Sequence, residues 1–223
     1  MDKYSWPEPQ RQVAFPIAGP GYPLIFALAF VTVVFALLGL TALAIIGLIA
    51  TLFVCYFFRD PDRVVPDKTG AVVSPADGRI VAAGEVNRSP MGQGACMKIS
   101  IFMSVFNVHV NRIPCTGTIS NIMHRPGRFF PADLDRASRE NEQNAVFLDV
   151  QQDKKICVVQ VAGLIARRII CKIQTGDVLS RGQRFGMICF GSRVDVYLPS
   201  DTILDVAIGD RVKAGASIIG HLT

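Results

Sequence analysis

Charged residues are missing from one long stretch of this 223-residue chain. None lies between Leu24 and Phe58, whereas acidic and basic residues are interspersed through the rest of the sequence. A run of 35 uncharged residues exceeds the roughly 20 that cross the ~30 Å apolar core of a bilayer. The same length disfavours the alternative, a core helix of a soluble protein. We therefore expect the chain to be held at a membrane.

The charge-free stretch is too long for one upright membrane helix. As a single helix it would extend about 52 Å at about 1.5 Å per residue. It is therefore either one strongly tilted span or two short half-spans folded back on each other, with a bend near Gly39, Thr41 and Gly47. The expected regions are an irregular tail (1–23), a membrane-associated apolar helical segment (24–58) and a separate domain (59–223).

Cysteine and histidine are too sparse and too scattered for a metal site. The six cysteines form no C-x-x-C pair, and the three histidines are not spaced from them as zinc ligands are. Most of the cysteines lie in apolar, strand-like runs, which fits a protein in a reducing compartment. The net charge of +5 is mild and suits an anionic membrane surface at least as well as nucleic acid. We expect no metal and no nucleic-acid partner.

After residue 58 the pattern is typical of strands. Short apolar runs are separated by glycine and proline at close intervals, as in compact β-rich folds. Residues 97–102 alternate most clearly, and 131–141 is the only good helix candidate. The sequence predicts a mainly antiparallel flattened barrel or sandwich with one short extra helix. Further strand candidates are residues 71–73, 79–83, 115–123, 155–161, 165–173 and 194–198. The last alternates as a half-buried strand does, with Val194, Val196 and Leu198 on the core side and Arg193, Asp195 and Tyr197 on the other.

One turn sequence occurs twice. Residues 176–182 (GDVLSRG) and 209–215 (GDRVKAG) share glycine, aspartate, an aliphatic residue and a second glycine at matching positions. Such turns resemble those of lipoyl- and biotinyl-carrier β-sandwiches. No lysine lies at a hairpin tip between matching strands, so the repeat predicts architecture and not a carrier function.

Three polar residues lie where strand-like runs end: Asp77, His109 and Ser192. Singly, they are ordinary as a turn former, a buried core histidine and a serine in a Gly191–Ser192 turn. Together they supply the acid, base and nucleophile of a Ser-His-Asp arrangement. The G-x-S-x-G elbow of α/β-hydrolases is absent, because Arg193 and a valine follow the serine. The residues alone predict a Ser-His-Asp site on a β-rich domain held at a membrane.

Several motifs of the chain occur together in one known family and in the same order. They are FFRDP (57–61), SPADG (74–78), FMSVFNVHVNR (102–112), NE (141–142) and FGS (190–192). The chain is thereby similar to the short form of the phosphatidylserine decarboxylase proenzymes, over most of its length after the apolar segment. Two positions depart from the family pattern. Gln143 replaces the arginine of an N-E-R motif, and Phe106 stands where many longer members carry a second histidine.

The resemblance implies that the chain cuts itself between Gly191 and Ser192. His109, oriented by Asp77, would take the proton of the Ser192 hydroxyl, which would attack the Gly191 carbonyl. Elimination and loss of ammonia would turn the serine into a pyruvoyl group, the covalent cofactor of the family. That group would form a Schiff base with the substrate amine and accept electrons as CO₂ leaves. His109 is also the nearest candidate for returning a proton afterwards.

The resemblance further implies the reaction, the partners and the location. It predicts a carboxy-lyase that makes phosphatidylethanolamine from phosphatidylserine in phospholipid biosynthesis. The fragments 1–191 (β chain) and 192–223 (α chain) would remain together as an αβ heterodimer, with further oligomerisation left open. We expect the enzyme at the cell membrane, with its catalytic domain on the cytoplasmic face.

A short basic and aromatic segment is expected to meet the phospholipid. It contains Arg125, Arg128, Phe129 and Phe130, so that guanidinium groups would lie at phosphate and the phenylalanines in lipid. The alternative is that both phenylalanines belong to the core.

Two other functions stay open. One keeps the chemistry but uses a related serine phospholipid. The other is a non-catalytic, membrane-tethered β-sandwich module, in which Gly191–Ser192 is merely a turn. Self-cleavage of the chain distinguishes the catalytic interpretations from the module.

Overall fold

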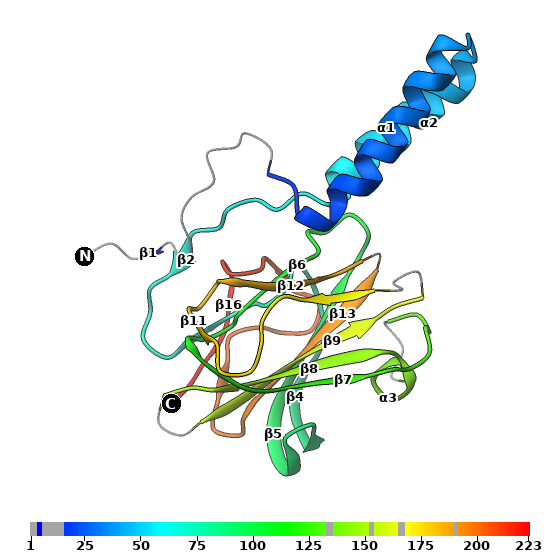
Figure 1. The fold of residues 1–223 in the computed structure, drawn as a ribbon. Helices are drawn as coiled ribbons and strands as arrows, with labels where there is room; N and C mark the ends of the chain where they lie inside the picture. Colours follow the sequence, from blue (N-terminus) through cyan, green and yellow to red (C-terminus); the bar gives the residue numbers. More distant parts are fainter. Residues whose placement is uncertain (1–3, 6–15, 133–135, 152–153, 165–167, 190) are drawn as a thin grey trace. The chain divides into compact units, whose positions relative to one another are not determined.

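The computed structural model describes residues 4–5, 16–132, 136–151, 154–164, 168–189 and 191–223. The chain divides into two compact units (Figure 1). One is Arg11–Asp62, and the other joins Met1–Gln10 to Arg63–Thr223. Each unit is described separately below.

The apolar segment forms two helices folded back on each other. After the 3₁₀ turn η1 (Gly19–Gly21), α1 spans Tyr22–Leu37 and α2 spans Thr41–Phe57. The chain reverses at Gly39, whose φ of +71° is a left-handed conformation that suits glycine. Of the helices in the described part of the chain, Gly19–Leu37 is the one long and apolar enough to cross a membrane, and Thr41–Phe57 is apolar but shorter.

Small and polar contacts hold this helical pair together. A β-carbon on Gly47 would lie 2.5 Å from the Thr32 hydroxyl oxygen, so the two helices approach closely there. At the open end, the Ala18 amide donates to the Phe58 carbonyl at 2.8 Å, and Ile17 forms an antiparallel bridge with Arg59. These bonds join the segment before α1 to the segment after α2. If the two helices enter a membrane, both of these segments therefore lie on the same side of it.

The larger unit is β-rich, which confirms the predicted fold class. Its main element is an eight-stranded antiparallel sheet that curls around one side of the core (Figure 1). In spatial order, its strands are β11 (Val178–Leu179), β7 (Gly117–Arg125), β8 (Gln143–Asp149), β9 (Lys155–Ala162), β13 (Ser192–Pro199), β5 (Gly92–Met103), β4 (Gly78–Ser89) and β15 (Arg211–Val212).

Smaller sheets complete this unit. Two of them have three strands each, and β1 and β2 form a two-stranded ribbon. In spatial order, the strands are β10 (Ile169–Cys171), β12 (Arg184–Ile188) and β6 (Val110–Arg112); β14 (Ile203–Leu204), β16 (Ile218–His221) and β3 (Ala71–Val73); and β1 (Tyr4–Ser5) with β2 (Val65–Pro66).

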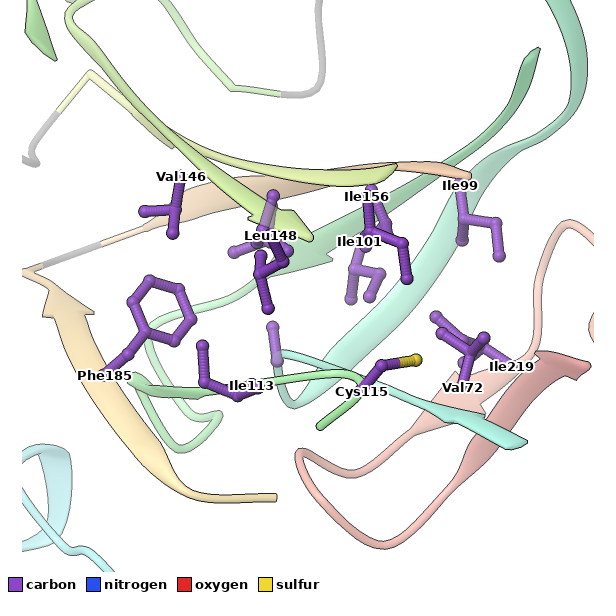
Figure 2. Packing of buried hydrophobic residues seen from close by; sticks show 14 of the residues in the cluster. Val72, Ile99, Ile101, Ile113, Cys115, Val146, Leu148, Ile156, Phe185 and Ile219 are labelled. Carbon is purple, nitrogen blue, oxygen red and sulfur yellow. The ribbon is translucent and has the colours of Figure 1, made fainter. Parts of the chain in front are cut away.

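The main core lies between the large sheet and the smaller ones (Figure 2). Side chains of β5, β8 and β9 enter it from one side, among them Ile101, Leu148 and Ile156. Phe185 of β12 and Ile219 of β16 enter it from the smaller sheets. All five residues are 0 % exposed, so their apolar surface is fully removed from water.

Strand β13 differs from the half-buried strand that the sequence suggests. Val194, Val196 and Leu198 face the main core, in agreement with their alternation. The polar side, however, is buried as well, because Arg193 is 3 % and Asp195 is 1 % exposed. The two side chains pair at 2.8 Å, and Lys98 lies 3.3 Å from the same carboxylate. A buried ion cluster therefore lies on the outer face of the central strand.

The repeated turn sequence is a repeated structure. In each copy the aspartate accepts a hydrogen bond from the amide three residues earlier: Asp177 from Gln174 at 2.9 Å, and Asp210 from Ala207 at 2.8 Å. Gly176, Gly182, Gly209 and Gly215 all have φ between +73° and +104°. One copy leads into β11 and the other into β15, at opposite edges of the large sheet. The repeat is architectural.

Two predicted elements are shorter than expected. Of the helix predicted over 131–141, the described part contains α3, Ala137–Glu140. The flanking Asn141 side chain bonds both the amide and the carbonyl of Phe130, which holds the ends of the segment together as a loop. The strand predicted over 165–173 is β10, Ile169–Cys171. Residues 133–135 and 165–167 lie outside the described part.

The six cysteines are free thiols, and three of them, Cys96, Cys115 and Cys157, are buried. Burial raises the pKa of the Cys115 thiol to about 12. Burial, together with the nearby Asp195 carboxylate, raises the pKa of Cys157 to about 12. Both thiols are thus neutral in the fold at pH values where they ionise in the unfolded chain, whose ordinary value is 9.0.

We expect the free energy of unfolding to fall as pH rises above about 9, because unfolded thiols ionise there while Cys115 and Cys157 cannot. Below that pH their contribution is complete. Urea unfolding of the full chain in detergent between pH 7 and about pH 11 measures the slope. A Cys115→Ala/Cys157→Ala variant should have the shallower slope, whereas Val158→Ala should lose stability equally at every pH. Equal slopes in all three proteins would contradict this assignment.

Candidate active site

Ser192 is the first residue of β13, which is an inner strand of the large sheet. It is fully buried, between Met103 at the end of β5 and Ala162 at the end of β9. Its side chain faces the main core, and its hydroxyl donates to the Met103 sulfur at 3.5 Å. A thioether is a weak acceptor, so this hydroxyl is held only loosely. Phe190 of the FGS motif lies outside the described residues.

The peptide before Ser192 is held in an unusual position. Gly191 has a φ of +63°, which other residues rarely adopt. Its carbonyl packs directly on Gly163, where an added β-carbon would lie 2.1 Å from the Gly191 oxygen and 3.0 Å from its carbonyl carbon. Gly163 therefore fixes where the Gly191 carbonyl can lie. Sequence reasoning missed Gly163, and its signal was a glycine directly after the buried strand β9.

Asp77 lies immediately before β4, at the same end of the sheet. Strand β4 pairs with β5 through Arg79 and Phe102, and β5 pairs with β13. The backbone of β4 is thus two strand spacings, about 10 Å, from that of β13. The Asp77 carboxylate accepts the Ala214 amide at 2.7 Å and pairs with Arg63 at 2.9 Å. It thereby ties the residues after the cleavage motif to the residues before it.

His109 approaches from the opposite side of the core. It is fully buried directly before β6, and its Nδ1 lies 2.9 Å from the Asn107 carbonyl oxygen. Two residues later, Asn111 of β6 donates to the Met103 sulfur at 3.8 Å, the same sulfur that accepts the Ser192 hydroxyl. His109 therefore lies two residues from a side chain that shares a contact with Ser192.

The structure places Asp77 and Ser192 at the same end of the large sheet, and His109 directly before β6 of a smaller sheet. Their assembly into a Ser-His-Asp site stays a prediction. In the uncut chain Asp77 is bonded to Arg63 and Ala214, and Ser192 is bonded to Met103. A proton relay from Ser192 to His109 and Asp77 requires the Ser192 hydroxyl to turn away from Met103. Apo geometry of this kind does not exclude a general base, because catalytic bonds often tighten only later in the reaction.

Arg193 anchors the residue that follows Ser192. Its guanidinium donates to the Ala132 carbonyl at 2.9 Å, to Asp195 at 2.8 and 3.1 Å, and to the Ser138 hydroxyl. Bidentate pairing of this kind is geometrically specific. Sequence reasoning placed Arg193 on a solvent-facing side and so missed this role.

The predicted lipid-contacting segment lies on the surface near the same sheet end. Arg125 donates to the carbonyls of Ser138 and Arg139 at 3.3 and 2.9 Å, and Arg128 lies 3.6 Å from Glu140. Phe129 is half-buried against the main core. Contact of these residues with lipid stays a prediction.

Phe130 also belongs to this segment. It is half-buried, with the Arg136 guanidinium 3.5 Å from its ring centroid. The Asn141 amide donates to the carbonyls of Phe130 and Ala162, at 2.8 and 2.7 Å. Since Ala162 neighbours Ser192 in the sheet, Asn141 connects this surface segment to the site.

We expect Gly163→Ala to slow cleavage at Gly191 by about 10²-fold, the cost of misplacing reacting atoms by about 1 Å. The matched control is Gly117→Ala, whose β-carbon would lie 2.6 Å from the Asp149 carbonyl oxygen at a distant part of the sheet. It should lose stability but cut at the native rate. Fragment formation in freshly synthesised chains measures both, and a native rate for Gly163→Ala would refute the placement.

Comparison with known proteins agrees with the motifs. The family described as phosphatidylserine decarboxylase matches residues 50–220. A protein of Geotalea uraniireducens (strain Rf4), named phosphatidylserine decarboxylase proenzyme, is 51% identical over 207 residues, covering 93% of this chain and 97% of its own. One of Desulfotalea psychrophila with the same name is 47% identical, covering 95% and 99%. The chain belongs to the phosphatidylserine decarboxylase family.

Proposed function

We propose that this protein decarboxylates phosphatidylserine to phosphatidylethanolamine in phospholipid biosynthesis, after cutting itself between Gly191 and Ser192. Its relatives' shared name, phosphatidylserine decarboxylase proenzyme, supports both the reaction and the processing. The observation that carries the proposal is the Gly191–Ser192 peptide. The Gly191 carbonyl packs against Gly163, and the buried Ser192 hydroxyl donates to a weak acceptor, the Met103 sulfur.

Cleavage begins with the Ser192 hydroxyl. Rotation away from Met103 brings it to the Gly191 carbonyl, while His109, with Asp77, takes its proton. The peptide bond becomes an ester with a free amine at residue 192, and elimination releases the Gly191 carboxylate. The remaining dehydroalanine tautomerises and is hydrolysed to a pyruvoyl group and ammonia. General-base assistance is worth about 10²–10⁴-fold. Proximity of the hydroxyl to its own peptide carbonyl adds to it.

The surroundings of residue 192 fit a pyruvoyl group. The position is fully buried between Met103 and Ala162, which both belong to the apolar core. When present, the group supplies an electron-accepting carbonyl for the substrate amine. The chain's own residues exclude water, fix the backbone through Arg193, and hold at His109 a proton for return to the product.

The membrane supplies the substrate. The apolar helices α1 and α2 would hold the enzyme at the cell membrane, with the catalytic unit on the cytoplasmic face, where a head group can reach residue 192. Arg125 and Arg128 are exposed, and each basic residue near an anionic surface contributes about 1 kcal/mol. Phe129 and Phe130 would border the lipid.

A denaturing gel with mass spectrometry tests the proposal. We expect the native chain to yield fragments 1–191 and 192–223, the smaller one lacking a free amine. Ser192→Ala lacks the nucleophile and should remain one chain, and His109→Gln should cut at least about 10²-fold more slowly. A native chain that stays whole while it decarboxylates phosphatidylserine would rule out this mechanism.

The two fragments should remain one particle. Residues 192–223 provide β13, β15 and β16, which pair with β5, β9, β4 and β3 of the larger fragment. We therefore expect an αβ heterodimer that releases the small fragment only when the large sheet unfolds. Size-exclusion chromatography in increasing urea, followed beside far-ultraviolet circular dichroism, measures this. Release well before loss of the sheet signal would show that the strands exchange freely.

A further inference from the structure

A row of buried amide side chains crosses the core toward Ser192. Asn144 on β8, Gln160 on β9 and Asn111 on β6 are each at most 3 % exposed. Asn144 Nδ2 donates to Gln160 Oε1 at 3.0 Å, and Gln160 Nε2 donates to Asn111 Oδ1 at 2.8 Å. Amides in an apolar core are costly unless they are bonded, and bonded networks are rigid. The row therefore joins the large sheet to β6 in one fixed arrangement.

The donors in this row run in one direction, from Asn144 through Gln160 to Asn111. Because Asn111 Oδ1 accepts from Gln160, its Nδ2 is turned to the Met103 sulfur, 3.8 Å away. The same sulfur accepts the Ser192 hydroxyl. A thioether is a poor partner for an amide, so Asn111 presents a weakly used N–H group to the same sulfur that accepts the Ser192 hydroxyl.

Strand β12, which pairs with β6, leaves space for the Gln160 amide. Gly186 of β12 pairs with Asn111 in the small sheet. A β-carbon there would lie 3.1 Å from Gln160 Nε2, the atom that orients Asn111, and 2.3 Å from the Ile170 carbonyl oxygen. Because Gly186 has no side chain, the Gln160 amide can pack between the two sheets.

We propose that Asn111 is the hydrogen-bond donor to the oxygen at residue 192, and that Gln160 is the positioning residue that aims it. This inference rests on the proposed function and adds a residue to its site. In the uncut chain the donor stabilises the serine oxygen as its proton leaves. In the processed chain the serine oxygen has left with the Gly191 carboxylate, and the donor would polarise the ketone oxygen that replaces the amine on the α-carbon of residue 192. A preoriented donor in a buried site is worth far more than in water, and it adds no charge to repel or trap a substrate.

Substitutions at the two positions test the proposal. Asn111→Leu removes the donor and should slow self-cleavage by about 10²-fold, as loss of an oxyanion donor does. Gln160→Met keeps the volume but frees the Asn111 amide to turn, and should slow cleavage about five- to tenfold, the worth of one ordinary hydrogen bond. The double variant should be no slower than Asn111→Leu, because Gln160 acts only through Asn111.

Two readouts that do not depend on decarboxylation are used. The first is the rate at which newly synthesised full-length chains form fragments. The second is the rate at which phenylhydrazine reacts with the carbonyl of fragments that have formed, which should fall in both single variants. Val158→Ala is the matched control, because it removes core volume from β9 one step along the same face. It should cut within about twofold of the native rate.

The outcomes separate this inference from the proposed function. A native chain that never cuts contradicts the function itself. A native chain that cuts, with Asn111→Leu equally fast, overturns only the role of Asn111, as does a Val158→Ala variant slowed as much as Asn111→Leu. If Asn111→Leu does not fold, Asn111→Asp keeps the shape and replaces the donor with an oxygen. Native-rate cleavage in that variant overturns the inference as well.

Discussion

The pairing of β13 with both β5 and β9 is the constraint on which the rest of the site depends. It places Ser192 between Met103 and Ala162, fully buried, in the middle of an eight-stranded sheet. A strand bonded on both sides cannot shift its register without losing the core contacts of Val194 and Val196. Ser192 is therefore positioned by a strand that is hydrogen-bonded on both sides, and not by a surface loop.

Buried polar groups lie on both faces of the sheet near the start of β13, where the Gly191–Ser192 peptide lies. Arg193 and Asp195 fix the strand from the outer face, where Lys98 completes a buried cluster. Asn111 and Gln160 approach from the inner face. Such groups contribute little stability by themselves, since burying them offsets much of what their bonds gain. Their common position beside residue 192 indicates that they specify geometry.

The roles of Asp77, His109 and Ser192 stay predictions, whereas the sequence predicted the β-rich class and the family, and it gave the folding back of the apolar segment as one of two arrangements. Strand alternation and the motif order were sufficient for these, because both are local in the chain. Local signals could not reveal that Gly163 supports the Gly191 carbonyl or that Gln160 reaches Asn111, since each contact joins distant segments. They also misplaced Arg193, because alternation alone cannot show that a polar face is covered. The helix expected over 131–141 is present but shorter, since the described part forms α3 over Ala137–Glu140 and Asn141 bonds back to Phe130.

Residue 192 itself offers the most direct measurement. Serine labelled with ¹³C at the α-carbon can be incorporated into the full chain, which is purified and assayed on phosphatidylserine vesicles. In active protein, the expected spectrum contains one ketone carbon, and it belongs to the fragment that begins at residue 192. Active protein whose residue 192 keeps an ordinary serine α-carbon within an unbroken chain would contradict the self-made carbonyl on which the proposed chemistry depends.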